Sequence, residues 1–498
     1  MKIFTYLFLF FSYVSFADTA KPNIIWVVME DLCPDFGCYG NDLIKTPNLD
    51  QLASEGTLYT NAFASAPVCS TARSAFFTGM YQSSINAHHH RSHLNDGHEL
   101  PSEVKLLSDY LQDVGYHCIL MGPKQKTDFN FKEPEGVFDK TDSERSSSMG
   151  AYVHCPSDLK ILDGPAWKSV RKGKPFFAQI NYTEAHRTFI ADKLNPISPN
   201  DVKVPLCYPD HEITRRDWAL YLETLQFLDM KIGNLIEELK EAQALENTVI
   251  FFFGDHGRPM LRGKQWLYDA GIKVPLIVWG KGMSKGKIES RLVSLIDLMP
   301  ATLSLAGVEP PNYLEGQNFL QENLQREYVY AQRDRCDETD DKIRAVRDKR
   351  FKYIRNYYPE RPYTQFNAYK KLEYPVLTLM ELLHSKGELN EIQAQFMAET
   401  RPVEELYDTL NDPDEVYNLA DNKKYSQTLL RLRKALDQWE VDTNDGGRLI
   451  ESPLIKDYWD KFFKDFYIKV MKSRGLSPQI SNEDYLKWWD EQLKRQGK

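Results

Sequence analysis

Two pairs of side chains that could bind a metal each follow a run of apolar residues. Glu30 and Asp31 come after PNIIWVVM, and Asp255 and His256 come after NTVIFFFG. Three carboxylates and an imidazole form an oxygen-rich set of ligands that suits a hard cation such as Ca²⁺ or Mg²⁺. A single such pair could equally cap a following helix. Because the pattern occurs twice, it favours a metal site.

A lone cysteine lies in a second unusual stretch, APVCSTARSAFFTGMYQ. Cys69 is predicted to lie at or just before the N-terminus of a helix, where free N–H groups and the helix dipole favour negative charge. Arg73 lies one turn further on and would share a face with Cys69. Together they could hold an anionic group, or an anion formed from the cysteine. The alternative is a buried thiol beside a surface arginine.

The segments that must position these residues alternate between strand and helix patterns. This alternation predicts an α/β fold, in which a large, mostly parallel sheet lies between layers of helices. Chemistry in such folds gathers beyond the C-terminal ends of the strands, where both acidic pairs are placed. The predicted strands are 22–31, 116–122, 175–182, 247–254 and 274–280, and the predicted helices are 46–56, 103–115, 217–244 and 294–308.

The residue pattern changes near residue 326, where short, aromatic-rich segments typical of strands begin, with turn signals between them. We therefore predict a catalytic α/β domain over 22–325 and a smaller C-terminal antiparallel α+β subdomain over 326–422. The charged, tryptophan-containing segment 423–498 is predicted to form a helical extension.

The chain begins with the features of a secretory signal peptide. A lysine is followed by a short apolar run and by Ser15-Phe16-Ala17, a small-x-small cleavage pattern. We predict a signal peptide over 1–17, cleavage after Ala17, and a secreted or periplasmic mature protein. No later segment has the roughly 18 unbroken apolar residues of a membrane span.

Composition narrows the class of partner. The 498 residues carry 62 basic and 71 acidic side chains, a net charge of −9, which argues against general nucleic-acid binding. The seven cysteines are too few for a disulfide scaffold, and their odd number leaves at least one thiol without a partner within the chain.

Several segments together resemble the type I, formylglycine-dependent sulfatases of the alkaline phosphatase superfamily. CSTAR, at 69–73, resembles their Cys-x-Pro-x-Arg signature, and VVMEDL and GDHGRPMLRGKQWLYDAGIKVPLIVWG resemble their two metal-binding segments. TPNLDQLASEGTLYTNAF, SLIDLMPATLSLAGV and ELYDTLNDPDEVYNLA resemble further signatures. The resemblance covers about residues 22 to 420, and its ordered motifs are specific. The segment around 333–335 is similar to the branch near heparan N-sulfatase.

The resemblance implies how Cys69 would react. A maturation enzyme would convert it to formylglycine, whose hydrated aldehyde attacks the sulfur of a sulfate ester and later expels sulfate. Arg73 would orient the oxygens made from the cysteine, and Lys264 would grip the sulfate. His186 is implied as the general acid for the leaving oxygen. Outside the family, Lys264 and His186 would be interpreted as a surface lysine and a loop histidine.

The resemblance also implies that the metal is Ca²⁺, with Mg²⁺ as the alternative. Its ligands would be Glu30, Asp31, Asp255, His256 and the modified residue at Cys69. Glu30 departs from the family, which has aspartate there and thus a side chain one methylene shorter.

Two other departures affect conversion and catalysis. Thr71 stands where the family usually has proline or alanine, so recognition by the maturation enzyme is open. GPKQKTDFNF stands where the family has Gly-Lys-x-His. The catalytic lysine there would be Lys126, with Asp128 in the place of the histidine, or it would be Lys124; we favour Lys126.

Substrate contacts are expected from two further segments. His88, His89 and His90 in NAHHHRSH could line the pocket, form a second and softer metal site, or belong to an exposed loop. In the second region, the predicted substrate contacts are Arg333, Asp334 and Arg335, because guanidinium groups bind sulfates and carboxylates well.

The sequence thus predicts an exported sulfatase that acts on a sulfated polysaccharide or its oligosaccharides. Two alternatives stay open. One is a phosphoester or phosphonate hydrolase of the same superfamily, and the other is an inactive protein that binds sulfated glycans.

Overall fold

The computed structural model describes residues 21–121, 127–142, 162, 164–445 and 451–496. The predicted signal peptide and the two candidate lysines Lys124 and Lys126 lie outside these residues. Among the described helices, none combines the length and the apolar character needed to cross a membrane.

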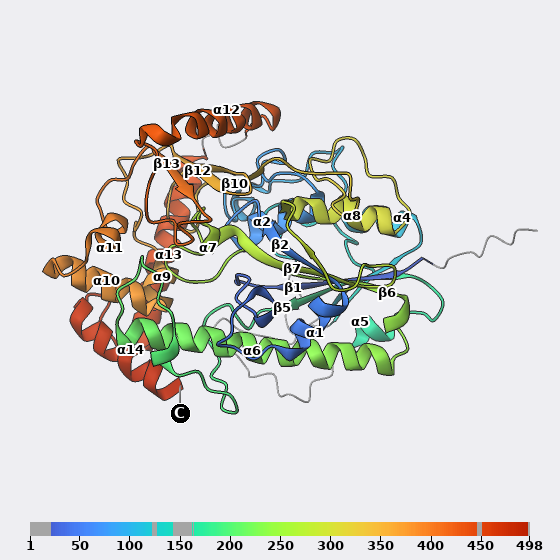
Figure 1. Cartoon of the computed structure of the whole chain (residues 1–498), viewed down its shortest axis with the longest axis horizontal. Helices are drawn as coiled ribbons and strands as arrows, with labels where there is room; N and C mark the ends of the chain where they lie inside the picture. Colours follow the sequence, from blue (N-terminus) through green and yellow to red (C-terminus); the bar gives the residue numbers. More distant parts are fainter. Residues whose placement is uncertain (1–20, 122–126, 143–161, 163, 446–450, 497–498) are drawn as a thin grey trace, which may run out of the picture.

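A mixed, mostly parallel sheet forms the centre of the molecule (Figure 1). Its strands run in the order β4-β3-β5-β1-β6-β7-β2-β8, and β9 pairs with β2. The strands from β4 to β6 are mutually parallel, whereas β7 is antiparallel to both of its neighbours. The strand bounds are β1 Asn23–Met29, β2 Thr57–Phe63, β3 His117–Met121, β4 Lys140–Thr141, β5 Phe176–Tyr182, β6 Thr248–Gly254, β7 Lys273–Gly280, β8 Lys287–Glu289 and β9 Val293–Ser294.

The register of the central strands decides where chemistry can occur. Met29, at the end of β1, lies opposite Tyr182 of β5 on one side and Gly254 of β6 on the other. Three parallel strands therefore end at the same height, and the residues that follow them meet at one edge of the sheet.

Helices cover both faces of this sheet, as the alternating strand residues require (Figure 1). One face of β1 packs in a core with α1, α5 and α6, and the other face packs with α2, α4 and α8. Trp26 lies at the centre of the second layer, where four phenylalanine rings surround it edge-on and its indole N–H donates to Thr302 at 3.0 Å. The helix bounds are α1 Pro47–Glu55, α2 Cys69–Thr78, α3 His93–Asp96, α4 Leu107–Asp113, α5 Pro165–Lys168, α6 Glu212–Glu241, α7 Asp269–Ile272 and α8 Leu298–Leu305.

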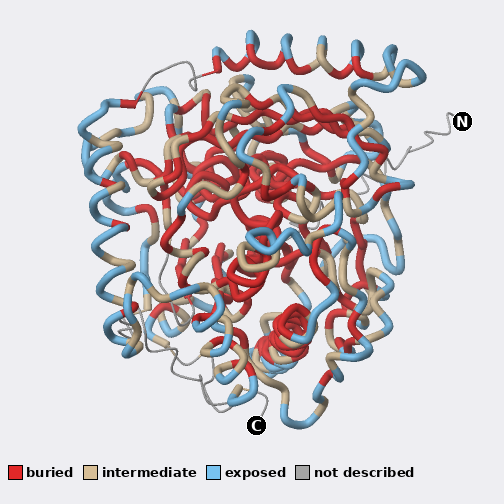
Figure 2. Tube along the Cα trace, turned by 90° about the vertical axis from the view of Figure 1, so that its left-hand side faces the viewer, coloured by how far each residue is buried: buried red, intermediate tan, exposed pale blue. Residues whose placement is uncertain are grey.

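A second, antiparallel sheet of four strands in the order β10-β11-β12-β13 follows in the C-terminal half. Helix α12 packs on β11 and β12 with one buried side and one exposed side (Figure 2). Helices α9 and α13 contact each other, and α10 and α14 pack against α6 of the first region. The bounds are β10 Val329–Arg333, β11 Ile343–Arg347, β12 Phe351–Asn356, β13 Glu404–Asp408, α9 Ala368–Glu373, α10 Pro375–Lys386, α11 Glu391–Phe396, α12 Ser426–Asp442, α13 Pro453–Ser473 and α14 Asn482–Gln496.

These elements confirm the predicted fold class, a mostly parallel sheet between helices followed by a smaller antiparallel sheet. Local bounds differ at several elements, and for two helices the local cause is clear. The long helix begins at Glu212, before the predicted 217, because His211 caps it by accepting a hydrogen bond from the backbone of Ile213. Helix α4 begins only at Leu107, where Asp109 closes the first turn by accepting from the backbone of Leu106. The domain boundaries read from the sequence stay a prediction.

Candidate active site

The four predicted metal ligands converge at the edge where β1 and β6 end. Glu30, Asp31, Asp255 and His256 have exposed fractions of only 0 to 1%. The backbone N–H of Asp31 donates to Oδ1 of Asp255 at 3.1 Å, which joins the ends of the two strands. Asp31 has φ of +57°, a left-handed conformation that is uncommon outside glycine and occurs preferentially at functional sites.

Asp31 is the most heavily contacted of these acids. The ammonium group of Lys264 donates to both of its carboxylate oxygens, at 2.9 and 2.7 Å, and Nε2 of His256 lies 2.9 Å from Oδ1. Burial opposes ionisation of Asp31, but Lys264, His186 and His256 together hold its pKa well below the usual value. A carboxylate that remains ionised when buried is suited to bind a cation.

The donor set at this edge fits a divalent metal. Asp31, Asp255 and His256 each offer a ligand atom, and these atoms all lie within 4.8 Å of one another. Burial lowers the pKa of His256, but Asp255 and Asp31 outweigh it and raise the pKa to about 10, so a metal bound there would displace a proton. Glu30 is outside this group of three, and its role as a ligand stays a prediction.

Arg73 ties the two strand ends together. This side chain is fully buried, and its guanidinium group donates to Asp255 at 3.1 Å, to Glu30 at 3.2 Å and to Asn181 at 2.9 Å. Burial would lower the pKa of Arg73, but the charges of Asp255 and Glu30 raise it. The predicted face shared with Cys69 is therefore also the face toward the acids.

Cys69 is the first residue of α2, as predicted, and only 4% of it is exposed. It lies beside His256, whose pKa it helps to raise, and its side chain packs against Val68 and Cys336. Thr71 lies in the same first turn, and its hydroxyl donates to the carbonyl of Val68 at 3.1 Å. The helix therefore presents position 69 to the acidic cluster at its N-terminal end.

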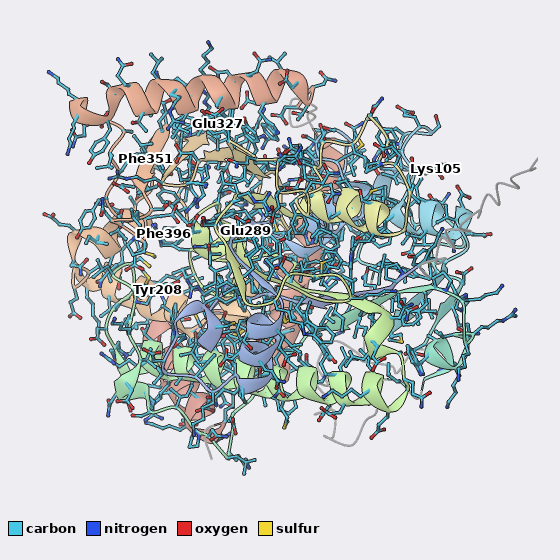
Figure 3. All side chains as sticks on the ribbon, turned by 45° about the vertical axis from the view of Figure 1, so that its right-hand side comes forward. Lys105, Tyr208, Glu289, Glu327, Phe351 and Phe396 are labelled. Carbon is cyan, nitrogen blue, oxygen red and sulfur yellow. The ribbon has the colours of Figure 1, made fainter. Side chains whose placement is uncertain are left out.

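A tight loop after β6 brings Lys264 to the acids. A Cβ atom on Gly263 would lie 2.3 Å from the carbonyl oxygen of Arg258, so only glycine fits there. The backbone N–H of Lys264 donates to the same carbonyl at 2.8 Å. Trp266, two residues further on, contacts the ring of Phe396 at 5.2 Å, and Phe396 is labelled in Figure 3. The C-terminal region thus supports the loop that carries Lys264.

His186 lies beside the cluster, with Nε2 3.8 Å from Oδ2 of Asp31 and 24% of its side chain exposed. Its ring contacts Tyr369 at a centroid distance of 5.5 Å, and the ammonium group of Lys264 lies 5.3 Å from the same ring. Partial exposure allows His186 to reach a substrate, as the role of proton donor requires.

Three residues near the site were missed by sequence reasoning. They are Asn181, which accepts from Arg73; Tyr369, between His186 and Lys264; and Arg91, whose charge interacts with Cys69. Asn181 is the sixth residue of β5, and a polar residue so near the end of a largely apolar strand could have identified it. The other two come from loops and a C-terminal helix, for which the sequence offers no comparable signal.

Asp128 faces the same region. Its Oδ1 lies 3.5 Å from Nη2 of Arg91, and its charge helps to raise the pKa of Arg73. The structure thus brings Asp128 toward the site, while the predicted role of Lys126 falls outside the described residues.

The three histidines after α2 do not form an exposed loop. His88 and His90 are 4% and 6% exposed, and the rings of His88 and His89 lie 4.4 Å apart. Burial, followed by the charges of His89 and Arg344, lowers the pKa of His88 well below its usual value.

The predicted contacts in the second region are buried and paired. Arg333 donates to Asp341 at 2.9 Å, Asp334 accepts from Arg344 at 3.0 Å, and Arg335 pairs with Glu451. None of the three is more than 4% exposed. Their contact with a substrate stays a prediction.

Comparison with known proteins points to one family. The family model named Sulfatase matches residues 22–308, and that named N-sulphoglucosamine sulphohydrolase, C-terminal, matches 254–402. An ulvan-active sulfatase of Formosa agariphila is 34% identical, over 88% of this chain and 78% of the relative. The N-sulphoglucosamine sulphohydrolase of Homo sapiens is 27% identical, over 86% of this chain and 91% of the relative.

A solved structure of a 2-O GAG sulfatase shares the fold. It aligns with a TM-score of 0.62 at 20% identity, over 88% of this chain and 96% of that one. The two family matches overlap between residues 254 and 308, on the segment that carries Asp255, His256 and Lys264.

Proposed function

The chain belongs to the sulfatase family, whose members hydrolyse sulfate esters, and we propose that its substrate is a sulfated polysaccharide or an oligosaccharide derived from one. Relatives named for activity on ulvan and on N-sulphoglucosamine support this substrate class. The single observation that carries the proposal is the placement of Cys69 at the start of α2, beside His256, Asp31, Asp255 and Lys264.

Two groups expected in the family fit the residues present. The proposed divalent cation would be held by Asp31, Asp255 and His256, with Glu30 as a further candidate, and Ca²⁺ suits these hard donors. Formylglycine would be made from Cys69 by a maturation enzyme. Together they would supply an oxygen nucleophile at position 69 and positive charge for the oxygens of the sulfate.

The chain's own cations would bind and orient the sulfate group. Arg73 and Lys264 are fixed by buried carboxylates on the two sides of position 69 and need little reorganisation when charge develops on the sulfate oxygens. Burial of the acids excludes water and strengthens these interactions. His186 would hold the proton that the leaving sugar oxygen receives, because it lies beside Asp31 and remains partly exposed.

The decisive experiment is desulfation of defined oligosaccharides by the purified enzyme. We expect sulfate release from ulvan-derived or N-sulfated oligosaccharides to exceed turnover of a matched phosphate ester by a wide margin. Preference for the phosphate ester would overturn the proposed substrate and favour a phosphoester or phosphonate hydrolase.

The proposed modification is tested by the mass of the peptide that contains Cys69. Conversion of the thiol to the aldehyde lowers that mass by about 18 Da, because sulfur is lost, oxygen is gained and two hydrogens are removed. An unconverted thiol in protein from the native host would favour an inactive binding protein, and Thr71 makes this measurement necessary.

We also propose export, on the basis of the leader pattern over 1–17. Protein recovered from the periplasm or the medium of the native host should begin directly after Ala17. Recovery of the intact N-terminus from the cytoplasm alone would contradict export.

A further inference from the structure

A second group of metal-ligating side chains lies next to Cys69, which packs against Cys336. His90, Cys336 and Asp337 each offer a ligand atom within 4.8 Å of the others, and all three residues are buried, at 6%, 2% and 7% exposure. We propose that these three residues form a zinc-binding site, distinct from the acidic cluster at the strand ends.

The spacing of the ligand atoms suits tetrahedral zinc. Nδ1 of His90 lies 3.1 Å from Oδ1 of Asp337 and 3.8 Å from Sγ of Cys336. Around a tetrahedral zinc ion with bonds of about 2.0 to 2.3 Å, neighbouring ligand atoms are separated by roughly 3.3 to 3.8 Å. Only small side-chain movements would therefore admit the ion.

The types of ligand decide which metal the site prefers. An imidazole, a thiolate and a carboxylate combine nitrogen, sulfur and oxygen, which suits Zn²⁺ and disfavours Ca²⁺. The group at the strand ends contains no sulfur ligand and suits a hard cation. Among the described residues, only these two groups were found to have metal-binding spacing.

The surroundings hold the ligands in place. Oδ2 of Asp337 accepts from Gln265 at 2.9 Å and from Asn367 at 3.3 Å, which leaves Oδ1 directed at His90. The backbone of Cys336 pairs with Thr339 through two hydrogen bonds of 3.0 and 2.9 Å. Such outer contacts orient metal ligands in known sites.

The site joins two parts of the chain that are far apart in sequence. His90 follows α2 in the first region, whereas Cys336 and Asp337 lie between β10 and β11 in the second. Arg335 fastens the two segments, since its carbonyl accepts from the backbone of His90 at 3.0 Å and its guanidinium group donates to the His90 carbonyl at 2.7 Å. A zinc ion would crosslink them and leave one coordination position for water or an anionic group of the substrate.

The test is metal binding by the full chain. Protein stripped with a chelator is incubated with Zn²⁺ alone, desalted and analysed for zinc, using a background of Asp31→Asn with Asp255→Asn to remove the hard site. We expect about one zinc ion per chain to be retained, and Cys336→Ser to retain less than a tenth of that amount. Cys118→Ser, at a buried thiol elsewhere, should retain the full amount.

Cobalt provides a second readout in the wild-type chain. Co²⁺ bound by a thiolate gives a ligand-to-metal absorption band in the near ultraviolet, which should appear in the wild type and in Cys69→Ser but not in Cys336→Ser. If Cys336→Ser does not fold, His90→Asn replaces it, with the same expected loss. Absence of zinc and of the band in the wild type, or their persistence without Cys336, would overturn the proposal and leave a direct ion pair between His90 and Asp337.

Discussion

Arg73 and Arg344 lie in different regions of the molecule but have similar immediate surroundings. Both are fully buried, and each bridges two carboxylates: Arg73 joins Glu30 to Asp255, and Arg344 joins Asp334 to Asp445. The difference is what lies beside the pair. Only Arg73 is neighboured by Cys69, the proposed nucleophile precursor at a helix N-terminus.

A buried arginine between two acids therefore does not by itself identify an active site. In the antiparallel sheet such pairs crosslink loops and strands, and their energetic effect is on folding. At the ends of the parallel strands, the residues that follow three neighbouring strands come together. An arginine paired with carboxylates at this position can therefore also face a substrate.

The largest expected effect on activity distinguishes Cys69 from Cys118, two buried cysteines. Cys69→Ala removes the proposed nucleophile, so kcat for a sulfate ester should fall by more than about 10³-fold, with little change in the thermal midpoint. Cys118→Ala, at a thiol in the core beside Ser108, should keep kcat and lose some stability. Equal retention of activity by both variants would remove position 69 from the chemistry.

The second effect separates two buried aspartates. Asp31→Asn removes a proposed metal ligand, and activity restored to chelator-treated enzyme by Ca²⁺ should fall by about 10²-fold or more. Asp297, which is equally buried and paired with Arg326, is the matched control. Asp297→Asn should lose stability but keep its response to Ca²⁺; if Asp31→Asn responds like the wild type, the metal lies elsewhere.

The third effect tests the two arginines directly. Arg73→Lys loses the forked contact with the strand-end acids, and kcat should decrease by about 10²-fold. Arg344→Lys should keep kcat and lower the free energy of unfolding by about 1 to 3 kcal/mol. Sulfate release and denaturant unfolding are measured on both variants. An equal loss of kcat in the two would contradict the different roles assigned to Arg73 and Arg344.

Much of this contrast could be predicted from the sequence. Strand β1 and its two acids, β6 with Asp255 and His256, and the start of α2 at Cys69 follow from continuous apolar runs and a local helix signal, because each involves only neighbouring residues. Tyr369 and the pairing of His90 with Cys336 and Asp337 could not be predicted, because they depend on the docking of segments about 100 to 250 positions apart, which no local pattern records.

The smallest expected effect is on stability and concerns two acids whose pKa values are shifted in opposite directions. Cations hold the pKa of Asp31 low, whereas burial, with a contribution from Asp269, raises the pKa of Glu415 to about 7 despite the nearby Lys352. Because this value exceeds that of an unfolded glutamate, the folded state binds the extra proton. The resulting stabilisation is complete below about pH 4.5 and is lost as the pH rises through about 7.

The wild type should lose stability between pH 5 and pH 8, and Glu415→Gln should make this loss smaller by an amount of the order of 1 kcal/mol. Urea unfolding at both pH values measures this, with Glu391→Gln, at an exposed position, as the control. An unchanged pH dependence in Glu415→Gln would show that Glu415 is already ionised at pH 5.

The position of β1 between β5 and β6 has a consequence for how the molecule opens. The innermost strand of a sheet exchanges its amide hydrogens last, whereas helices outside the sheet, such as α9, can detach in partial opening events of lower free energy. The acids that follow β1, Glu30 and Asp31, would therefore stay in place longer than Tyr369 of α9. A transiently opened molecule would keep its strand-end acids together while the contact between Tyr369 and His186 was lost.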